Sequence, residues 1–297
     1  MSTPGSPDRS GTTAIDRKRS AKIAQVRFRM LAFLLRATGI YWLGATNFRN
    51  LRVVRPTLAI PGMPTECDGL RILLLSDLHL GLGWGTASRL LASLENLTYD
   101  FAALAGDLVD EHGENPQLAE AQDGLRSVIA ALHRPVYAVL GNHDTADLYT
   151  LLDAGGVCIL NPDTATVHHH KGASIRLVGI PDGEAPSPPA TLLARKSGIT
   201  RDAGGLTICL AHNPADFRRA HALGARVYLC GHTHGGQICL PGGLPILHCR
   251  GVPPALMAGS WHHDGLYGFT TRGVGASGLP VRYFCPPEIA LVTLRTT

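Results

Sequence analysis

The sequence predicts an α/β protein in which buried strands alternate with helices. Three observations lead to this class: apolar runs of five or six residues, helix-period stretches between some of them, and many turn residues, with 34 Gly and 20 Pro in 297 residues. Short apolar runs bounded by turn residues are typical of strands buried on both faces. Their alternation with helical stretches is typical of α/β organisation. A composition of 45% hydrophobic and 17% charged residues is that of a globular protein.

The first 55 residues differ from the rest of the chain in charge. They hold eleven Lys or Arg and two Asp, a net charge of +9, whereas the remainder carries −5. Residues 1–20 lack apolar periodicity, and we expect residues 1–29 to form a disordered basic arm. Nucleic acid can bind such an arm, but the body is acidic and shows no basic–aromatic interleaving. We therefore predict no nucleic-acid partner.

The segment Met30–Ala45 is mostly apolar and is interrupted by Arg36. Its sixteen residues fall short of the roughly twenty that a transmembrane helix needs. The basic flank and the aromatic pair Tyr41 and Trp42 favour a helix in the lipid–water interface. A marginal span, a cleaved secretory signal and a helix packed on the protein's own core are the alternatives. We predict a membrane-associating helix and linker over residues 30–55, with membrane contact through residues 17–46.

The body begins with three apolar runs that predict buried strands: residues 70–75, 101–105 and 135–140. Ala87–Leu97 has leucines at helical spacing and predicts a helix between the first two, and Ala119–Leu132 is a second candidate helix. Open α/β sheets build their sites at the carboxyl ends of their strands. The polar residues at these three ends are Asp77 and His79, then Asp107, then Asn142, His143 and Asp144.

Two later apolar runs, residues 206–211 and 225–230, also predict buried strands. The first is followed by His212 and the second by GHTHGG, which contains His232 and His234. In extended chain, residues i and i+2 face the same side, so we expect these two histidines to point into one pocket. The flanking glycines let the backbone turn tightly and let a ligand approach closely.

The five strand ends share one kind of chemistry. Each one alone is typical of a turn or of a core histidine, but turn formation does not require five endings rich in Asp, Asn and His. Imidazole and carboxylate donors together suit Mn, Fe or Zn better than Mg or Ca. The sequence therefore predicts a metal site at the strand ends.

The order of these blocks resembles the calcineurin-like metallophosphoesterase family. The blocks are SDLHLG (76–81), GDLVD (106–110), GNHD (141–144), AHNP (211–214) and GHTHGGQ (231–237), and the resemblance covers about residues 70–295. It implies a four-layer α-β-β-α sandwich of two mixed sheets with a dinuclear metal site at strand ends. It also implies that residues 56–297 form the catalytic domain, which we expect on the cytoplasmic side of the membrane.

The resemblance assigns roles to ten residues. Two divalent ions (Mn, Fe or Zn) would be held by Asp77, His79 and His234 at the first position, by Asn142, His212 and His232 at the second, and by Asp107 between them. His143 matches the family's histidine that protonates the leaving oxygen or stabilises its charge. Asp110 and Asp144 are expected to orient a histidine, with a solvated loop carboxylate the alternative for Asp110.

These assignments imply a metal-dependent phosphoester hydrolase, a phosphodiesterase or pyrophosphatase at the membrane. The similar bacterial subgroup includes cell-envelope phosphodiesterases and a UDP-2,3-diacylglucosamine pyrophosphatase of lipid A synthesis, and a lipid-linked nucleotide suits a membrane-docked arm. The better-known lipid A pyrophosphatases carry Arg where this chain has His143, a departure that concerns the substrate rather than the chemistry. A generic or cyclic-nucleotide phosphodiesterase is one alternative, and a non-catalytic metal-stabilised binding module is another.

A triple histidine at residues 168–170 lies outside these blocks. The surrounding sequence, VHHHKGASIRLVGI, predicts a hairpin with a Lys-Gly turn. We expect the three histidines to lie on the surface, with adventitious metal binding the alternative.

Overall fold

The computed structural model describes residues 30–82, 84–110, 117–160, 166–189, 205–246, 248–249 and 251–297. The described chain divides into two units, one that ends at Leu43 and one from Gly44 to Thr297. The predicted disordered arm, residues 1–29, lies outside the described residues. Residues 30–37 are helical, and α2 spans Ile40–Arg49. None of the helices in the described ranges is both long enough and apolar enough to cross a bilayer.

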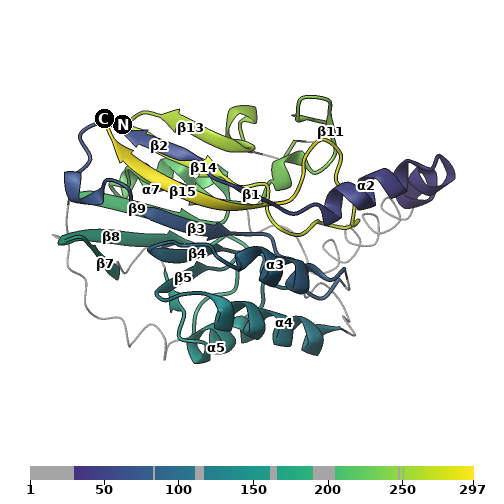
Figure 1. Ribbon diagram of the computed structural model, residues 1–297, viewed down its shortest axis with the longest axis horizontal. Helices are drawn as coiled ribbons and strands as arrows, with labels where there is room; N and C mark the ends of the chain where they lie inside the picture. Colours follow the sequence, from purple (N-terminus) through teal and green to yellow (C-terminus); the bar gives the residue numbers. More distant parts are fainter. Residues whose placement is uncertain are drawn as a thin grey trace, which may run out of the picture. The chain divides into compact units, whose positions relative to one another are not determined.

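The larger sheet of the second unit has seven strands and is mixed. Their order is β1-β15-β3-β4-β5-β6, with β2 also beside β15. Strands β3, β4 and β5 run parallel, whereas β15 is antiparallel to β3 (Figure 1). The strands are β1 (Arg52–Val54), β2 (Thr57–Ile60), β3 (Arg71–Leu75), β4 (Phe101–Ala105), β5 (Val136–Val139), β6 (Cys158–Ile159) and β15 (Glu288–Thr296).

The smaller sheet has six strands in the order β13-β14-β10-β9-β8-β7. Its central strands are parallel, and its two edge strands are antiparallel to their neighbours. The strands are β7 (Thr166–His170), β8 (Ala173–Ile180), β9 (Leu206–Ala211), β10 (Val227–Cys230), β13 (Gly259–His263) and β14 (Leu266–Thr270), with a separate hairpin of β11 (Cys239–Leu240) and β12 (Leu244–Pro245).

The two sheets form the inner layers of a sandwich, and helices cover its outer faces. The helices are α3 (Thr86–Leu94), α4 (Leu118–Ala131) and α5 (Asp147–Ala154) against the larger sheet and α7 (Phe217–Ala222) against the smaller one, with short 3₁₀ turns η1 (Thr65–Cys67), η2 (Pro214–Asp216), η3 (His234–Gly236) and η4 (Pro254–Leu256). This arrangement confirms the predicted mixed α/β fold of two sheets and covering helices.

Strand β3 shows why the predicted strands are continuous apolar runs. Leu73 and Leu75 pack against the helices, whereas Ile72 and Leu74 pack between the two sheets. All four are 0% exposed, because side chains alternate across a strand and both faces of this sheet are covered. All five predicted strands are present, and both predicted helices appear with ends shifted by one to three residues.

The triple histidine lies in the predicted hairpin, but the expectation of a surface position is wrong. Strands β7 and β8 pair antiparallel around the Lys-Gly turn. His168 and His170 are buried and only His169 is exposed. Strand alternation turns the first and third histidines toward the larger sheet, where the ring centroid of His168 lies 4.7 Å from that of Phe101.

Candidate metal centre

All ten predicted site residues follow the carboxyl ends of five strands. Strands β3, β4 and β5 of the larger sheet and β9 and β10 of the smaller sheet supply them. The residues are Asp77, His79, Asp107, Asp110, Asn142, His143, Asp144, His212, His232 and His234. Parallel strands put their carboxyl ends at the same edge of a sheet, so loops far apart in the sequence meet there.

Backbone hydrogen bonds join the loop after β3 to the loop after β4. The amide of Asp77 donates to the carbonyl of Gly106 at 3.0 Å, and the amide of His79 donates to the carbonyl of Asp107 at 3.1 Å. Leu80 and Val109 form a parallel bridge just beyond. The two loops therefore continue the sheet and hold their polar side chains in fixed register.

Five of the predicted ligands have left-handed backbone conformations. The φ angles are 52° for Asp77, 42° for His79, 51° for Asp107, 71° for His232 and 50° for His234. A positive φ is uncommon for residues other than glycine, and such strain gathers at functional sites. The extended geometry expected for His232 and His234 is therefore wrong. The chain coils between them, and the two histidines face two neighbouring groups instead of one.

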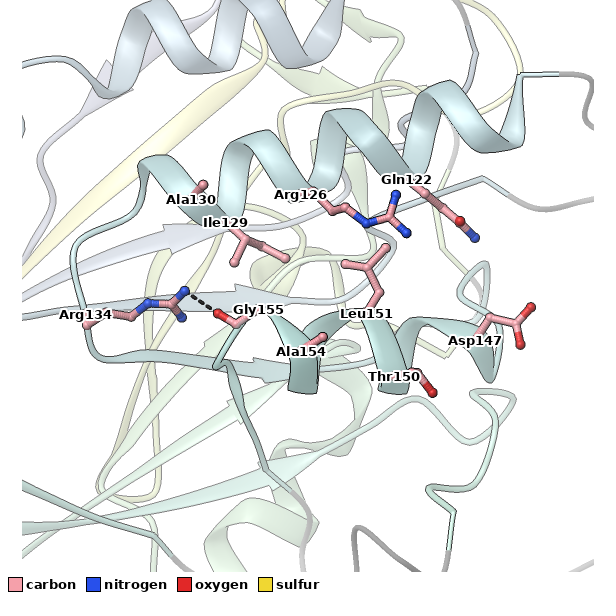
Figure 2. Close-up of a pocket in the computed structure, with 10 residues that line it drawn as sticks. All are labelled: Gln122, Arg126, Ile129, Ala130, Arg134, Asp147, Thr150, Leu151, Ala154 and Gly155. Atoms are coloured by element: carbon pink, nitrogen blue, oxygen red, sulfur yellow. Dashed lines mark hydrogen bonds between the residues drawn. The ribbon is translucent and has the colours of Figure 1, made fainter.

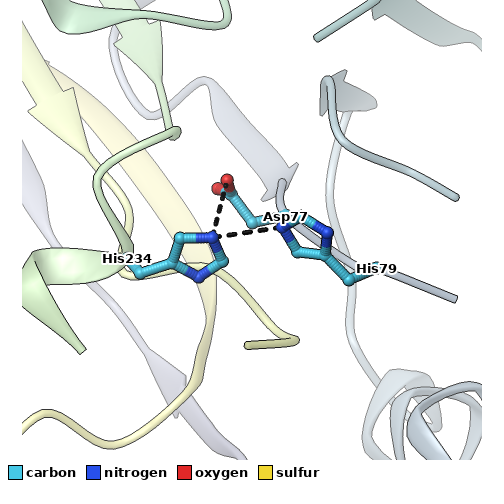
Figure 3. A group of neighbouring side chains, drawn as sticks. All are labelled: Asp77, His79 and His234. Atoms are coloured by element: carbon cyan, nitrogen blue, oxygen red, sulfur yellow. Dashed lines mark hydrogen bonds and ion pairs between the residues drawn. The ribbon is translucent and has the colours of Figure 1, made fainter. Parts of the chain in front are cut away.

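The first group contains Asp77, His79 and His234, all buried (Figure 3). Their candidate ligand atoms all lie within 4.8 Å of one another. Nε2 of His79 lies 3.1 Å from Nε2 of His234, which lies 3.6 Å from Oδ1 of Asp77. Two nitrogens and an oxygen thus converge on one small volume, as a divalent transition metal requires.

The second group contains Asp107, His212 and His232. Nε2 of His212 lies 3.1 Å from Nδ1 of His232 and 3.4 Å from Oδ2 of Asp107. The Asn142 side-chain oxygen lies 3.2 Å from the same His212 nitrogen. Oδ2 of Asp107 is also 3.7 Å from Nε2 of His79 in the first group. Asp107 is therefore placed between the two groups.

Two features of the surroundings fit a metal ion at these groups. Nδ1 of His212 lies 2.7 Å from the carbonyl oxygen of Ala105; a proton on Nδ1 donated to that oxygen leaves the Nε2 lone pair facing the cluster. A Cβ atom at Gly141 would overlap Oδ1 of Asp107, and one at Gly231 would overlap Oδ2 of Asp77. Glycine at these positions allows the carboxylates to approach the neighbouring backbone.

The charges around these groups favour a cation. Burial alone would lower the pKa of His212, but the Asp107 carboxylate beside it raises that pKa to about 10. Burial and neighbouring histidines instead lower the pKa of His232 and of His234. Carboxylates that hold a proton on a buried histidine occupy a place where a metal cation would be stabilised in the same way.

Asp110 lies between two histidines. Its Oδ1 is 3.5 Å from Nδ1 of His143, and its Oδ2 is 3.6 Å from Nδ1 of His79. The side chain is mostly buried, and although burial alone would raise the pKa of Asp110, His143 and His79 lower it well below its usual range. The amide of His143 donates to Oδ1 of Asp107 at 2.9 Å. Asp110 thus has the geometry to orient both imidazoles.

Asp144 contacts backbone rather than a histidine. Its carboxylate accepts hydrogen bonds from the amides of Leu108, Val109 and Gly141, at 2.7, 3.2 and 2.8 Å. These bonds tie the loop after β4 to the loop after β5. Burial, followed by the charge of Asp107, raises the pKa of Asp144 to about 6.

Sequence reasoning missed Arg282, which is 0% exposed. One guanidinium nitrogen donates to the carbonyl of His234 at 2.9 Å, and the other lies 3.3 Å from Nδ1 of the same histidine. The guanidinium also donates to the carbonyl of Gly275. The sequence offered one signal for this role: Arg282 is the single charged residue in the otherwise uncharged stretch PVRYF.

A cavity of about 630 Å³ lies between α4 and α5 and away from these groups (Figure 2). None of the ten predicted site residues lines it. Arg134, at one end, donates to the carbonyls of Gly155 and Gly156. These bonds satisfy backbone acceptors just after α5, which is a structural task.

Residues 70–236 match the model of the calcineurin-like phosphoesterase family. An uncharacterized metallophosphoesterase of Bacillus subtilis, YkuE, is 27% identical over 251 residues, which is 79% of this chain and 82% of the relative. A zebrafish (Danio rerio) transmembrane protein with a metallophosphoesterase domain is 29% identical over 95% of this chain and 67% of its own length. The phosphodiesterase YaeI of Escherichia coli is 32% identical over 54% of this chain and 58% of its own length.

Proposed function

Because the chain belongs to the calcineurin-like phosphoesterase family of metal-dependent phosphoester hydrolases, we propose that it hydrolyses phosphodiesters or pyrophosphates with two divalent metal ions. The observation that carries the proposal is the position of Asp107, whose Oδ2 lies 3.4 Å from His212 of one group and 3.7 Å from His79 of the other. One carboxylate placed between two sets of donors suits two adjacent ions better than one.

The charges in the site suit an anionic substrate. Two divalent ions, when bound, would polarise a phosphoryl oxygen and lower the pKa of water. The ligand carboxylates of Asp77 and Asp107 neutralise only part of their charge, and the histidines and Asn142 are neutral as ligands. The positive charge that remains would attract an anionic phosphate diester, because the protein's own carboxylates do not cancel it.

His143 is the proposed proton donor to the leaving oxygen. Asp110 faces its Nδ1 at 3.5 Å, which would hold the ring in a fixed orientation beside the proposed metal centre. Its backbone amide donates to Asp107, which fixes the residue next to the proposed metal bridge. Burial lowers the pKa of His143, but Asp110 and Asp107 outweigh burial and raise it, which favours the protonated form that a general acid needs.

Residues 17–46 are proposed to contact the membrane and so bring the enzyme to a lipid-linked substrate. Met30, Phe33, Leu34, Trp42 and Leu43 are exposed, which is unusual for large apolar side chains in a soluble protein. The basic residues before them would strengthen contact with anionic lipid. We propose UDP-2,3-diacylglucosamine as the first substrate to examine, with the catalytic domain on the cytoplasmic side.

The substrate test compares two phosphoesters with the Mn-loaded full chain. Release of UMP from UDP-2,3-diacylglucosamine, abolished by a chelator, is the expected result. Hydrolysis of bis(p-nitrophenyl) phosphate without UMP release would support the phosphodiesterase activity and contradict UDP-2,3-diacylglucosamine as its substrate. Cyclic AMP and cyclic GMP are assayed beside them, since a cyclic-nucleotide phosphodiesterase is the competing activity. No hydrolysis of any of these esters would contradict the proposed function.

The membrane test is cosedimentation with vesicles. We expect the full chain to bind phosphatidylglycerol vesicles more strongly than phosphatidylcholine vesicles, and we expect Phe33→Asp to weaken that binding. Leu240→Asp, which changes an exposed apolar residue of the body, is the matched control. Equal binding of Phe33→Asp and wild type would remove the apolar segment from the membrane contact.

A further inference from the structure

A second cavity, of about 320 Å³, adjoins the candidate metal centre. His79, a predicted ligand of the first metal, forms part of its wall. The remaining lining residues come from the loop after β3 and from helices α3 and α4. His79 alone of the ten predicted site residues lines this space, so a group that extends from a phosphate at the metal centre past His79 would enter it on the side of the two helices.

The inner wall of the cavity is apolar. Leu80, Leu82, Leu91 and Trp84 line it. The Trp84 ring packs edge-on against the buried ring of Phe48, with centroids 5.5 Å apart. These side chains offer an organic group a surface that would gain from losing contact with water.

The rim of the cavity is polar and carries negative charge. Glu120, Asp123 and Ser127 project from α4 and Gln117 lies just before it, and all four are exposed. Asp123 pairs with Arg126 at 2.6 Å, so Glu120 carries the negative charge of the rim. No lysine or arginine is among the described residues that line the cavity. The nearby Arg89 is not among the lining residues; its guanidinium donates to the Trp84 carbonyl and to the Thr86 hydroxyl and lies 4.8 Å over the ring of Phe48.

The geometry points to a substrate subsite: this cavity binds the organic group esterified to the phosphate, and it accepts an apolar, non-anionic group. The inference rests on the proposed phosphodiesterase activity and names the part of the substrate that the structure selects. The metal centre recognises the phosphate or pyrophosphate, the leucines and Trp84 bind the apolar body, and Glu120 repels negative charge at the outer end of that body. Neutral glycolipid and alkyl or aryl esters fit this description, whereas an ester with a terminal carboxylate does not.

The first test measures chain-length preference with alkyl p-nitrophenyl phosphates and the Mn-loaded full chain. We expect kcat/KM for the hexyl ester to exceed that for the methyl ester by about 10-fold or more. Ser88→Trp, which places a large ring in the cavity from an exposed position on α3, should bring the ratio close to one. Ala92→Trp, on the same helix but outside the lining, should keep the wild-type ratio.

The second test measures charge selection. Wild type should hydrolyse a neutral alkyl ester faster than an ester of the same length that ends in a carboxylate. Glu120→Lys should reduce that preference by roughly fivefold, and Glu95→Lys, an exposed change outside the lining, should leave it in place. Because each readout is a ratio of two substrates on one protein sample, partial unfolding of a variant cannot imitate the effect.

Loss of the subsite and loss of the proposed function would give different experimental results. No metal-dependent hydrolysis of any ester by wild type would contradict the proposed function itself. Hydrolysis by wild type with equal kcat/KM for hexyl and methyl esters would overturn the subsite and leave the activity standing. A wild-type preference that Ser88→Trp and Ala92→Trp alter equally would also overturn it, because the preference would then arise elsewhere.

Discussion

The smaller sheet carries two histidine pairs with the same spacing and different surroundings. His232 and His234 follow the carboxyl end of β10, in a loop where both have positive φ. His168 and His170 lie within β7, an antiparallel edge strand. The first pair meets the carboxylates of Asp77 and Asp107 and three other buried or half-buried donors. The second pair meets Phe101 and Tyr137, with one carboxylate at 3.6 Å from His170.

The comparison teaches that spacing and residue type do not make a metal site. A parallel strand end gathers loops from several strands, so donors from distant blocks converge. An antiparallel edge strand turns alternate side chains onto the neighbouring layer, where an imidazole serves as a partly apolar core residue. We expect the two pairs to differ in function as they differ in position.

The largest difference is expected when the proposed bridge is changed. Asp107→Asn should lower kcat/KM on bis(p-nitrophenyl) phosphate by about 10³-fold or more, because bound metals supply several kcal/mol of transition-state stabilisation. His168→Phe, at the other pair, should leave kcat/KM within about twofold. Equal losses of kcat/KM in Asp107→Asn and His168→Phe would show that the metal centre has no special role in hydrolysis. The metal content of both proteins is measured by mass spectrometry alongside the kinetics.

A second large effect separates proton transfer from metal binding at the metal centre. His143→Ala should lower turnover by roughly 10²–10⁴-fold while the bound metal remains at the wild-type level. His169→Ala, an exposed change in the triple histidine, is the control. Unchanged turnover of His143→Ala would remove this residue from proton transfer.

A smaller effect concerns the tight packing of Gly141 against Asp107. Gly141→Ala should lower the free energy of unfolding by about 1–3 kcal/mol, because the added methyl group overlaps Oδ1 of Asp107. Gly183→Ala is the matched control, since a Cβ at Gly183 meets nothing within 4 Å. Urea denaturation of the metal-free proteins measures both changes. If Gly141→Ala is as stable as the control, the added methyl group does not overlap Asp107 and the described packing is contradicted.

The smallest expected effect is a pH dependence at the second pair. Burial, helped by His170, lowers the pKa of His168. A histidine with a lowered folded-state pKa binds a proton more readily when the chain is unfolded, so its contribution to stability is complete above about pH 6.5 and is lost as pH falls below that value. His168→Phe should flatten this part of the stability curve, and His169→Phe should not. Parallel curves for wild type and His168→Phe between about pH 6.5 and 5 would contradict the assignment.

The sequence predicts the strand ends that carry His232 and His234, because buried strands have a recognisable composition. Strands such as residues 101–105 are buried on both faces and therefore appear as continuous apolar runs. The residues that follow them are rich in Asp, Asn and His, which marked the site. Local composition was sufficient wherever a feature depended on one strand and the turn after it.

The remaining features depend on contacts between distant segments. The burial of His168 follows from which sheet edge β7 occupies, and hairpin sequence alone does not determine that edge. Arg282 reaches His234 from 48 residues away. The left-handed conformations of His232 and His234 are maintained by contacts such as the bond from the His232 amide to Asp77. None of these is encoded in a short window of residues.

We propose that the two groups of the metal centre together hold two metal ions that act jointly in hydrolysis. The most direct measurement is a titration of the metal-free full chain with Mn²⁺, following hydrolysis of bis(p-nitrophenyl) phosphate and bound Mn²⁺ on the same samples. We expect activity to rise until about two equivalents per chain are bound. Full hydrolysis in the presence of a chelator, or saturation of activity at one equivalent, would contradict the claim.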